Sequence, residues 1–121
     1  MKNRIFVIMS LFLLLTVFSL QAHPPSSIQL DYDLQKKILH IEIKHISRNP
    51  REHRIRRIFI YVNDSEPREL YLSHQTTLAS DIEDIELDAK PGDRIRVKAF
   101  CSDSGEKEAT LVVTEPAEKI K

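Results

Sequence analysis

The chain has one cysteine, two glycines, no tryptophan and no excess of charge of either sign among its 121 residues. A single cysteine excludes an intramolecular disulfide, so packing must stabilise the core. The 18 basic side chains are balanced by 18 acidic ones. This balance excludes a general affinity for nucleic acid, which needs a sustained excess of Lys and Arg on one face. The length suits one small domain.

The N-terminus has the layout of a signal peptide. Residues 1–4 include the basic Lys2 and Arg4, residues 5–20 are uncharged and rich in Leu, Ile, Val and Phe, and the small Ala22 precedes a Pro-rich segment. The apolar run is short for a membrane span, so we expect a signal peptide at residues 1–22, cleavage after Ala22, and a periplasmic or extracellular protein. An uncleaved N-terminal anchor is the alternative, and it would be the only attachment to a membrane.

The alternation of apolar and polar residues predicts an all-β fold. After residue 27 helical periodicity is hard to find, while short alternating runs recur between turn signals. The expected strands cover residues 28–32, 38–45, 54–62, 69–72, 82–87, 94–101 and 110–114. Seven short antiparallel strands in about 100 residues predict an immunoglobulin-like β-sandwich at residues 23–114. The charged tail at residues 115–121 is expected to be disordered.

Cys101 ends the strand expected at residues 94–101, on the face of Ile95, Val97 and Ala99. Exported proteins usually pair their cysteines. An unpaired thiol on a core face is therefore either a small buried residue or a ligand or nucleophile kept for chemistry.

Two histidines flank the loop between the second and third expected strands. His45 ends one strand and His53 precedes the next, so the connection brings the two imidazoles close enough to bind one metal. Cys101 joins them if the sixth strand runs in the same direction as the second. Histidine and thiolate together suit iron, zinc or copper rather than calcium or magnesium. The competing interpretation is two solvated loop histidines and a buried small cysteine.

These stretches resemble the iron-binding domain of superoxide reductases and desulfoferrodoxins, an immunoglobulin-like sandwich. One stretch is the strand leading into His45, followed by the loop and residues 53–58 (HRIRRI), which is similar to the family's His-loop-His-Tyr-Ile-x-x-Ile pattern. The other is residues 90–101 (KPGDRIRVKAFC), similar to the family's turn and the strand that ends in its cysteine ligand. The likeness covers most of residues 38–105. In that family four equatorial histidines and one axial cysteinate hold a non-haem iron that reduces superoxide to peroxide.

The resemblance implies a metal site at His23, His45, His53 and Cys101, with Cys101 as the axial thiolate and His23 as the N-terminal histidine. The family's fourth histidine follows its cysteine by three residues, and here that position holds Ser104. A chain without this imidazole, and without the family's anion-guiding lysine, is expected to be a degenerate member. Whether it is an enzyme is left open, and we assign no catalytic residue beyond the ligands.

The implied partners are a small anion such as superoxide and a separate electron donor, because the sequence encodes no second metal centre. Five arginines around the loop would attract an anion. They are Arg48, Arg51, Arg54, Arg56 and Arg57. The alternative for them is a solvated face balanced by the acidic residues of 81–88.

Two other functions fit the sequence. The sandwich also resembles the small carrier-binding subunit of bacterial thiosulfate-oxidising complexes, in which the fold is a protein-interaction module; Cys101 would then be structural. Cleavage after Ala22 would also create a free N-terminal His23, whose amino nitrogen and imidazole could chelate copper.

Overall fold

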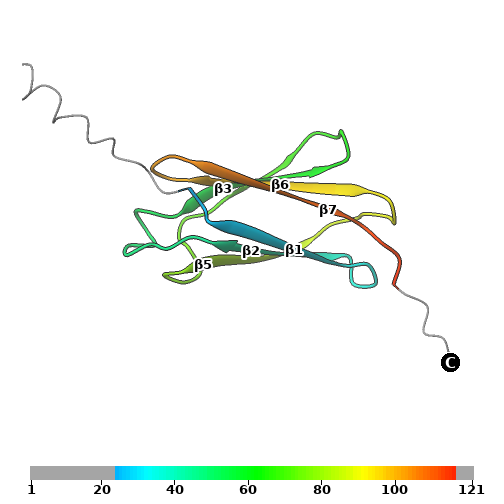
Figure 1. Cartoon of the computed structure of the whole chain (residues 1–121), viewed down its shortest axis with the longest axis horizontal. Coiled ribbons are helices and arrows are strands. Elements are labelled where there is room, and N and C mark those ends of the chain that lie inside the picture. Colours follow the sequence, from blue (N-terminus) through cyan, green and yellow to red (C-terminus); the bar gives the residue numbers. More distant parts are fainter. Residues whose placement is uncertain (1–23, 117–121) are drawn as a thin grey trace, which may run out of the picture.

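The computed structural model describes residues 24–116, which form seven β-strands in two sheets packed face to face (Figure 1). The strands are β1 (Ser27–Asp33), β2 (Ile38–Lys44), β3 (Ile55–Val62), β4 (Arg68–Tyr71), β5 (Ser80–Glu86), β6 (Arg94–Cys101) and β7 (Glu106–Val112). The predicted signal peptide, His23 and residues 117–121 of the predicted tail lie outside the described residues. No helix within residues 24–116 is long and apolar enough to cross a membrane.

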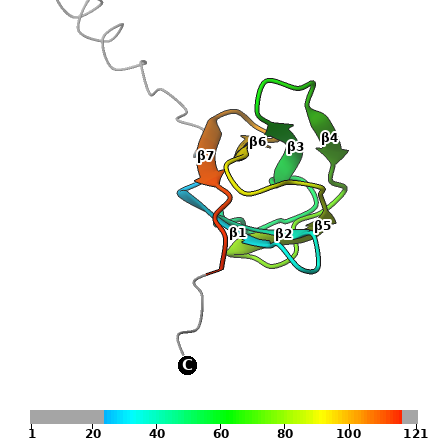
Figure 2. The same cartoon turned by 90° about the vertical axis from the view of Figure 1, so that its right-hand side faces the viewer.

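One sheet has the strand order β1-β2-β5 and the other the order β4-β3-β6-β7. Every paired neighbour is antiparallel. A view turned by 90° shows the sheets as two layers, with β1, β2 and β5 in one and β4, β3, β6 and β7 in the other (Figure 2). The predicted seven-stranded immunoglobulin-like sandwich is therefore confirmed.

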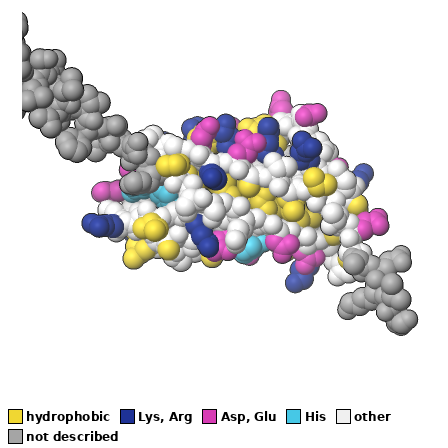
Figure 3. Space-filling model, viewed as in Figure 1, with side chains coloured by type: hydrophobic (Ala, Val, Ile, Leu, Met, Phe, Trp, Pro, Cys, Tyr) yellow, Lys and Arg dark blue, Asp and Glu magenta, His cyan; other side chains and the backbone are white. Residues whose placement is uncertain are grey.

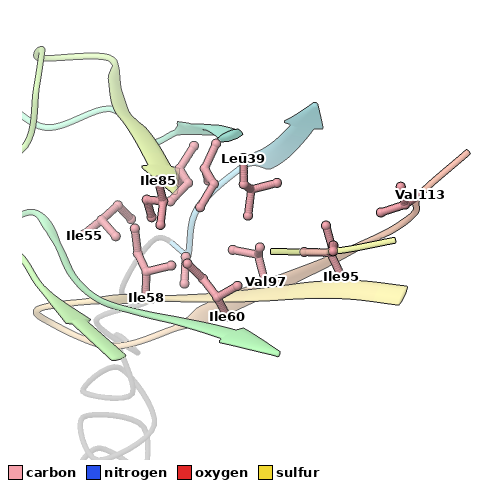
Figure 4. Packing of buried hydrophobic residues seen from close by; sticks show 12 residues of the cluster. Leu39, Ile55, Ile58, Ile60, Ile85, Ile95, Val97 and Val113 are labelled. Carbon is pink, nitrogen blue, oxygen red and sulfur yellow. The ribbon is translucent and has the colours of Figure 1, made fainter. Parts of the chain in front are cut away.

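The core lies between the two layers and is built from the strands that alternate most regularly. Leu39, Ile41 and Ile43 of β2 are fully buried, and they face the buried residues of β3 and β6 (Figure 4). Burial of each such side chain stabilises the fold by about 1.5–3 kcal/mol. A register shift between Ile55 and Arg57 allows Ile55 and Ile58 both to face the core despite their odd spacing.

The strand β7 begins four residues before the predicted start at residue 110. It is the last strand of its sheet, and its first half presents Glu106 and Glu108 to solvent, where they pair with Lys98 and Arg96 of β6. Because the first half of β7 buries few side chains, its sequence does not alternate between apolar and polar residues. The sequence pattern therefore did not predict this half of the strand.

Three connections lie at one end of the sandwich. The register pairs Ser80 with Lys44, at the end of β2, and Ile55 with Cys101, at the end of β6. The loops at residues 45–54, 72–79 and 102–105 therefore meet there. Backbone hydrogen bonds tie them together, from His45 N to Ala79 O (2.9 Å) and from Ser102 N to Arg54 O (2.8 Å).

Candidate metal centre

Two side chains of the loop at residues 45–54 and the last side chain of β6 converge at this end of the sandwich. His45, His53 and Cys101 each place one ligand atom so that the three atoms lie within 4.8 Å of one another. The Nε2 atom of His53 is 3.1 Å from Nε2 of His45 and 3.3 Å from Sγ of Cys101. The predicted convergence of these three residues is confirmed, and the arrangement is a cluster that could hold a metal ion.

Strand alternation and a tight loop place the three side chains. His45 follows the last residue of β2 and continues its buried face, so it is only 2% exposed. Cys101 ends β6 on the face of Val97 and Ala99 and is 7% exposed. His53 is half-buried in the turn before β3. Its backbone N–H donates to Asn49 O (2.8 Å), and its carbonyl accepts from the hydroxyl of the buried Ser47.

A buried glutamine fixes the protonated nitrogen of His45. The Nε2 group of Gln75 donates to the carbonyl oxygens of His45 (2.7 Å) and Thr77 (2.9 Å), so the amide oxygen of Gln75 faces the imidazole. That Oε1 atom lies 2.8 Å from Nδ1 of His45. Since an amide oxygen can only accept, Nδ1 of His45 carries the proton and Nε2 presents its lone pair.

The carboxylate of Asp103 fixes the protonated nitrogen of His53. The Nδ1 atom of His53 is 3.0 Å from Oδ2 of Asp103, a residue of the loop that follows β6. An ionised carboxylate only accepts, so Nδ1 of His53 donates and its Nε2 presents a lone pair toward His45 and Cys101.

With both imidazoles neutral, the centre of the cluster has fewer protons than acceptors. Two imidazole lone pairs face each other across 3.1 Å, and the thiol of Cys101 can donate its single proton to only one of them. Two nitrogens and a sulfur on one tetrahedral zinc ion would be separated by about 3.3 Å (N to N) and about 3.5 Å (N to S), given Zn–N and Zn–S bonds of about 2.0 and 2.3 Å. The two separations that involve His53, 3.1 Å to His45 and 3.3 Å to Cys101, are within a few tenths of an ångström of these values, while the ligand atoms of the whole set lie within 4.8 Å of one another.

The imidazoles and the thiol border different hollows. A pocket of about 700 Å³ next to the imidazoles is lined by Pro24, Ser26, His45, Ile46, Ser47, Arg48, Asn49 and His53. Cys101 instead borders a smaller hollow of about 310 Å³ on the side of Arg56, Arg57 and the loop at residues 102–105. Figure 3 displays histidine and basic side chains close together at this end of the molecule. Access from solvent to the imidazole side is therefore separate from the thiol.

The remaining histidines of the described residues lie outside the cluster. His40 faces outward, with Nδ1 2.5 Å from Oδ1 of Asp84, and His74 lies beside Ser73 in the loop before β5. Ser104 borders the smaller hollow. His23 lies outside the described residues, so its place in the predicted ligand set is untested.

The predicted arginine cluster does not converge on the imidazoles. Arg48 alone of the five lines the pocket beside them. The guanidinium of Arg57 stacks over Phe59 (5.5 Å) and Phe100 (5.0 Å), and that of Arg54 donates to Leu72 O (2.9 Å). The pattern of basic residues thus overstated the positive charge at the site.

Sequence reasoning missed Gln75 and Asp103, the two hydrogen-bond partners of the imidazoles. Asp103 follows Cys101 by two residues in a tight turn, and this proximity to a predicted ligand could have indicated it from the sequence. Gln75 lies in a loop of 72–79 that carries no pattern, and 30 residues separate it from His45.

Comparisons of the chain with protein-family models, with curated proteins and with solved structures found no match.

Proposed function

We propose that this chain is an exported domain that binds one transition-metal ion through Nε2 of His45, Nε2 of His53 and Sγ of Cys101. The observation that carries the proposal is the pair of imidazole Nε2 atoms 3.1 Å apart beside a thiol, with both Nδ1 atoms hydrogen-bonded elsewhere. One cation at the centre satisfies all three acceptors at once.

The donor set supports iron, zinc or copper as the ion. Imidazole nitrogens and a thiolate are ligands that these metals prefer, and hard oxygen-seeking cations are disfavoured. Three protein donors leave at least one coordination position for a small ligand, and the pocket beside His45 and His53 gives that ligand a path from solvent. The site therefore has the composition of a reactive centre rather than a closed structural one.

His23 is the proposed fourth ligand, and with it an open position remains only for an ion that takes more than four ligands, such as iron. Pro24 borders the same pocket as both imidazoles, and His23 precedes it by one peptide bond. Cleavage after Ala22 would also give His23 a free amino group, which favours copper in the variant of this proposal where the N-terminus itself chelates.

The finer proposal is a superoxide-reductase-like function with non-haem iron. A bound iron ion would supply one-electron transfer to a small anion, with its reactivity raised by thiolate ligation. The residues of this chain would hold the ion, keep both imidazoles in one orientation, and attract the anion through Arg48 at the pocket. The described residues include no second metal cluster, so a separate protein or small-molecule reductant would be the electron donor.

Metal analysis of the mature protein tests the proposal. We expect about one equivalent of a transition metal after purification or reconstitution, and its loss in His53→Ala and Cys101→Ser. His40→Ala is the matched control, because it removes an imidazole that lies on the opposite sheet face from the cluster. Substoichiometric metal in the wild type, or equal metal content in all four proteins, would contradict the proposal.

A second measurement separates the finer proposals. Loss of superoxide with a supplied reductant should depend on Cys101, so unchanged activity in Cys101→Ser would end the superoxide-reductase interpretation. Metal that is lost only in His23→Ala would favour the N-terminal copper chelate.

A protein-interaction module is the competing function, and one surface feature favours it. Ile46 (82% exposed) and Leu78 (60% exposed) lie on loops joined by a hydrogen bond from Ser47 N to Leu78 O (2.7 Å). Exposed apolar side chains grouped at one end are typical of contact surfaces. Absence of metal together with capture of a partner that Ile46→Ser abolishes would support this function.

A further inference from the structure

We infer that Gln75 and Asp103 are positioning residues that determine which nitrogen each imidazole presents to the centre of the cluster. The part of this inference that concerns metal affinity rests on the proposed function, whereas the part that concerns the imidazoles holds for the metal-free protein. A neutral imidazole in water carries its proton on either nitrogen, and only one of the two forms leaves Nε2 free to bind.

Gln75 is held so that only its oxygen can reach His45. The side chain is 2% exposed, and its backbone N–H donates to Pro50 O (3.0 Å). Both protons of its amide are used by the carbonyl oxygens of His45 and Thr77. Rotation of the amide by 180° would place its oxygen against two carbonyl oxygens, which is unfavourable at both contacts.

Asp103 sits on a loop that is clamped at both ends. Cys101 N donates to Gly105 O (3.0 Å), and the hydroxyl of Ser102 donates to Glu52 O (2.9 Å). Gly105 has a positive φ of 94°, and a Cβ atom built there would lie 2.9 Å from Cα of Pro24. The turn is therefore fixed against β6 and the start of the described chain, which holds the carboxylate of Asp103 beside His53.

The two partners act with different strength. Gln75 offers a neutral amide oxygen, while Asp103 offers a carboxylate, whose charge makes the hydrogen bond stronger. Loss of such an outer partner typically lowers metal affinity 10- to 100-fold. We therefore expect Asp103→Ala to weaken metal binding by about this factor, and Asp103→Asn, which keeps an oxygen acceptor without the charge, to weaken it less.

The variants of Asp103 suit the test because the side chain is 55% exposed and its removal leaves the core intact. Asp64→Asn is the matched control, since Asp64 is an exposed residue in the turn between β3 and β4, at the opposite end of the molecule. The first readout is ¹⁵N NMR of the imidazoles in metal-free protein at alkaline pH, which distinguishes the two neutral forms of a ring. The second is titration with Co²⁺ as a spectroscopic probe of thiolate ligation.

In wild type and Asp64→Asn we expect both histidines in the form protonated at Nδ1. Asp103→Ala should convert His53 to a mixture of the two forms, and Asp103→Asn should largely restore the wild-type spectrum. Gln75→Leu should convert His45 to a mixture of its two neutral forms. Circular dichroism verifies that the sandwich of this variant is folded. The affinity for Co²⁺ should fall in the order wild type, Asp103→Asn, Asp103→Ala.

An unchanged form of His53 in Asp103→Ala would overturn the inference. Equal affinity of wild type and Asp103→Ala for Co²⁺ would also overturn it. A wild-type protein that binds no Co²⁺ would refute the proposed function, and the NMR result would still decide the positioning role.

Discussion

Replacing Glu83 by glutamine should stabilise the protein at neutral and alkaline pH and leave its stability nearly unchanged in acid. Asp81 and Glu83 point inward from β5, the edge strand of its sheet, where they lie opposite Ile43 and Ile41. Asp81 is 1% exposed, and its Oδ2 atom has no hydrogen-bond partner among the described residues. Partial burial of Glu83, followed by the charge of Asp81, raises the pKa of Glu83 to about 7. A protonated Glu83 can donate its O–H to the carboxylate of Asp81, which an ionised Glu83 cannot do.

The raised pKa of Glu83 makes the folded state less stable as the pH increases. Because the pKa of Glu83 is raised from its ordinary 4.5 to about 7, the folded state binds more protons than the unfolded state between these values. The stabilisation by protonated Glu83 is therefore fully present below pH 4.5 and is lost as the pH rises through about 7. A tenfold change in a protonation equilibrium is worth about 1.4 kcal/mol, which gives an upper bound of about 3 kcal/mol. Glu83 is only partly buried, so solvent screening reduces the expected effect to about 1 kcal/mol.

Glutamine mimics the protonated side chain at every pH and keeps a donor for Asp81. Urea unfolding of metal-free protein at pH 4.5 and at pH 8 measures the difference, and we expect the midpoint of Glu83→Gln to exceed that of wild type by about 0.5–1 M urea at pH 8 only. Glu86→Gln is the control, because Glu86 is exposed on the same strand. A difference between Glu83→Gln and wild type that is the same at both pH values would refute the reasoning.

Two further predictions concern metal and backbone. Addition of Zn²⁺ at about 100 times its Kd should raise the free energy of unfolding of the wild type by about 2.7 kcal/mol, and a chelator should reverse this. Neither addition should affect Cys101→Ser. Chemical denaturation in matched buffers measures the difference, and an equal response of both proteins would argue against Cys101 as a ligand. Gly105→Ala should destabilise the protein by about 1–3 kcal/mol, more than Gly92→Ala. Both glycines have a positive φ, but an added Cβ at Gly105 would meet Pro24 at 2.9 Å whereas Gly92 has open space; equal thermal midpoints for the two variants would show that this contact contributes nothing.

The sequence predicted the central strands well because each has one face in the core. In β2 and β6 every second residue is apolar and buried, so alternation set both the strand bounds and the inward direction of His45 and Cys101. The edge strands were predicted less well. The inner face of β5 carries Asp81 and Glu83, and inward charges on an edge strand erase the apolar signal while they oppose pairing with another chain.

The candidate site was only partly accessible to sequence reasoning, for a related reason. His45, His53 and Cys101 could be brought together because strand direction alone fixes which strand ends share one end of a sandwich. Gln75 reaches His45 only because the loop of 72–79 folds over the end of β2, a tertiary contact with no local pattern. Arginines close in sequence to the loop diverged, since long side chains take their direction from neighbouring rings and carbonyls.

The close approach of Pro24 to Gly105 determines where an affinity tag would lie relative to the cluster. The chain enters the described fold at the pocket beside the imidazoles and leaves it at the far end, past Val113 (Figure 1). A polyhistidine tag fused in front of residue 24 would therefore be tethered at the mouth of the pocket, where its own imidazoles would compete for the ion. The described chain ends at residue 116, at the opposite end of the sandwich from the pocket, so we expect a tag on that side to interfere less with the metal content.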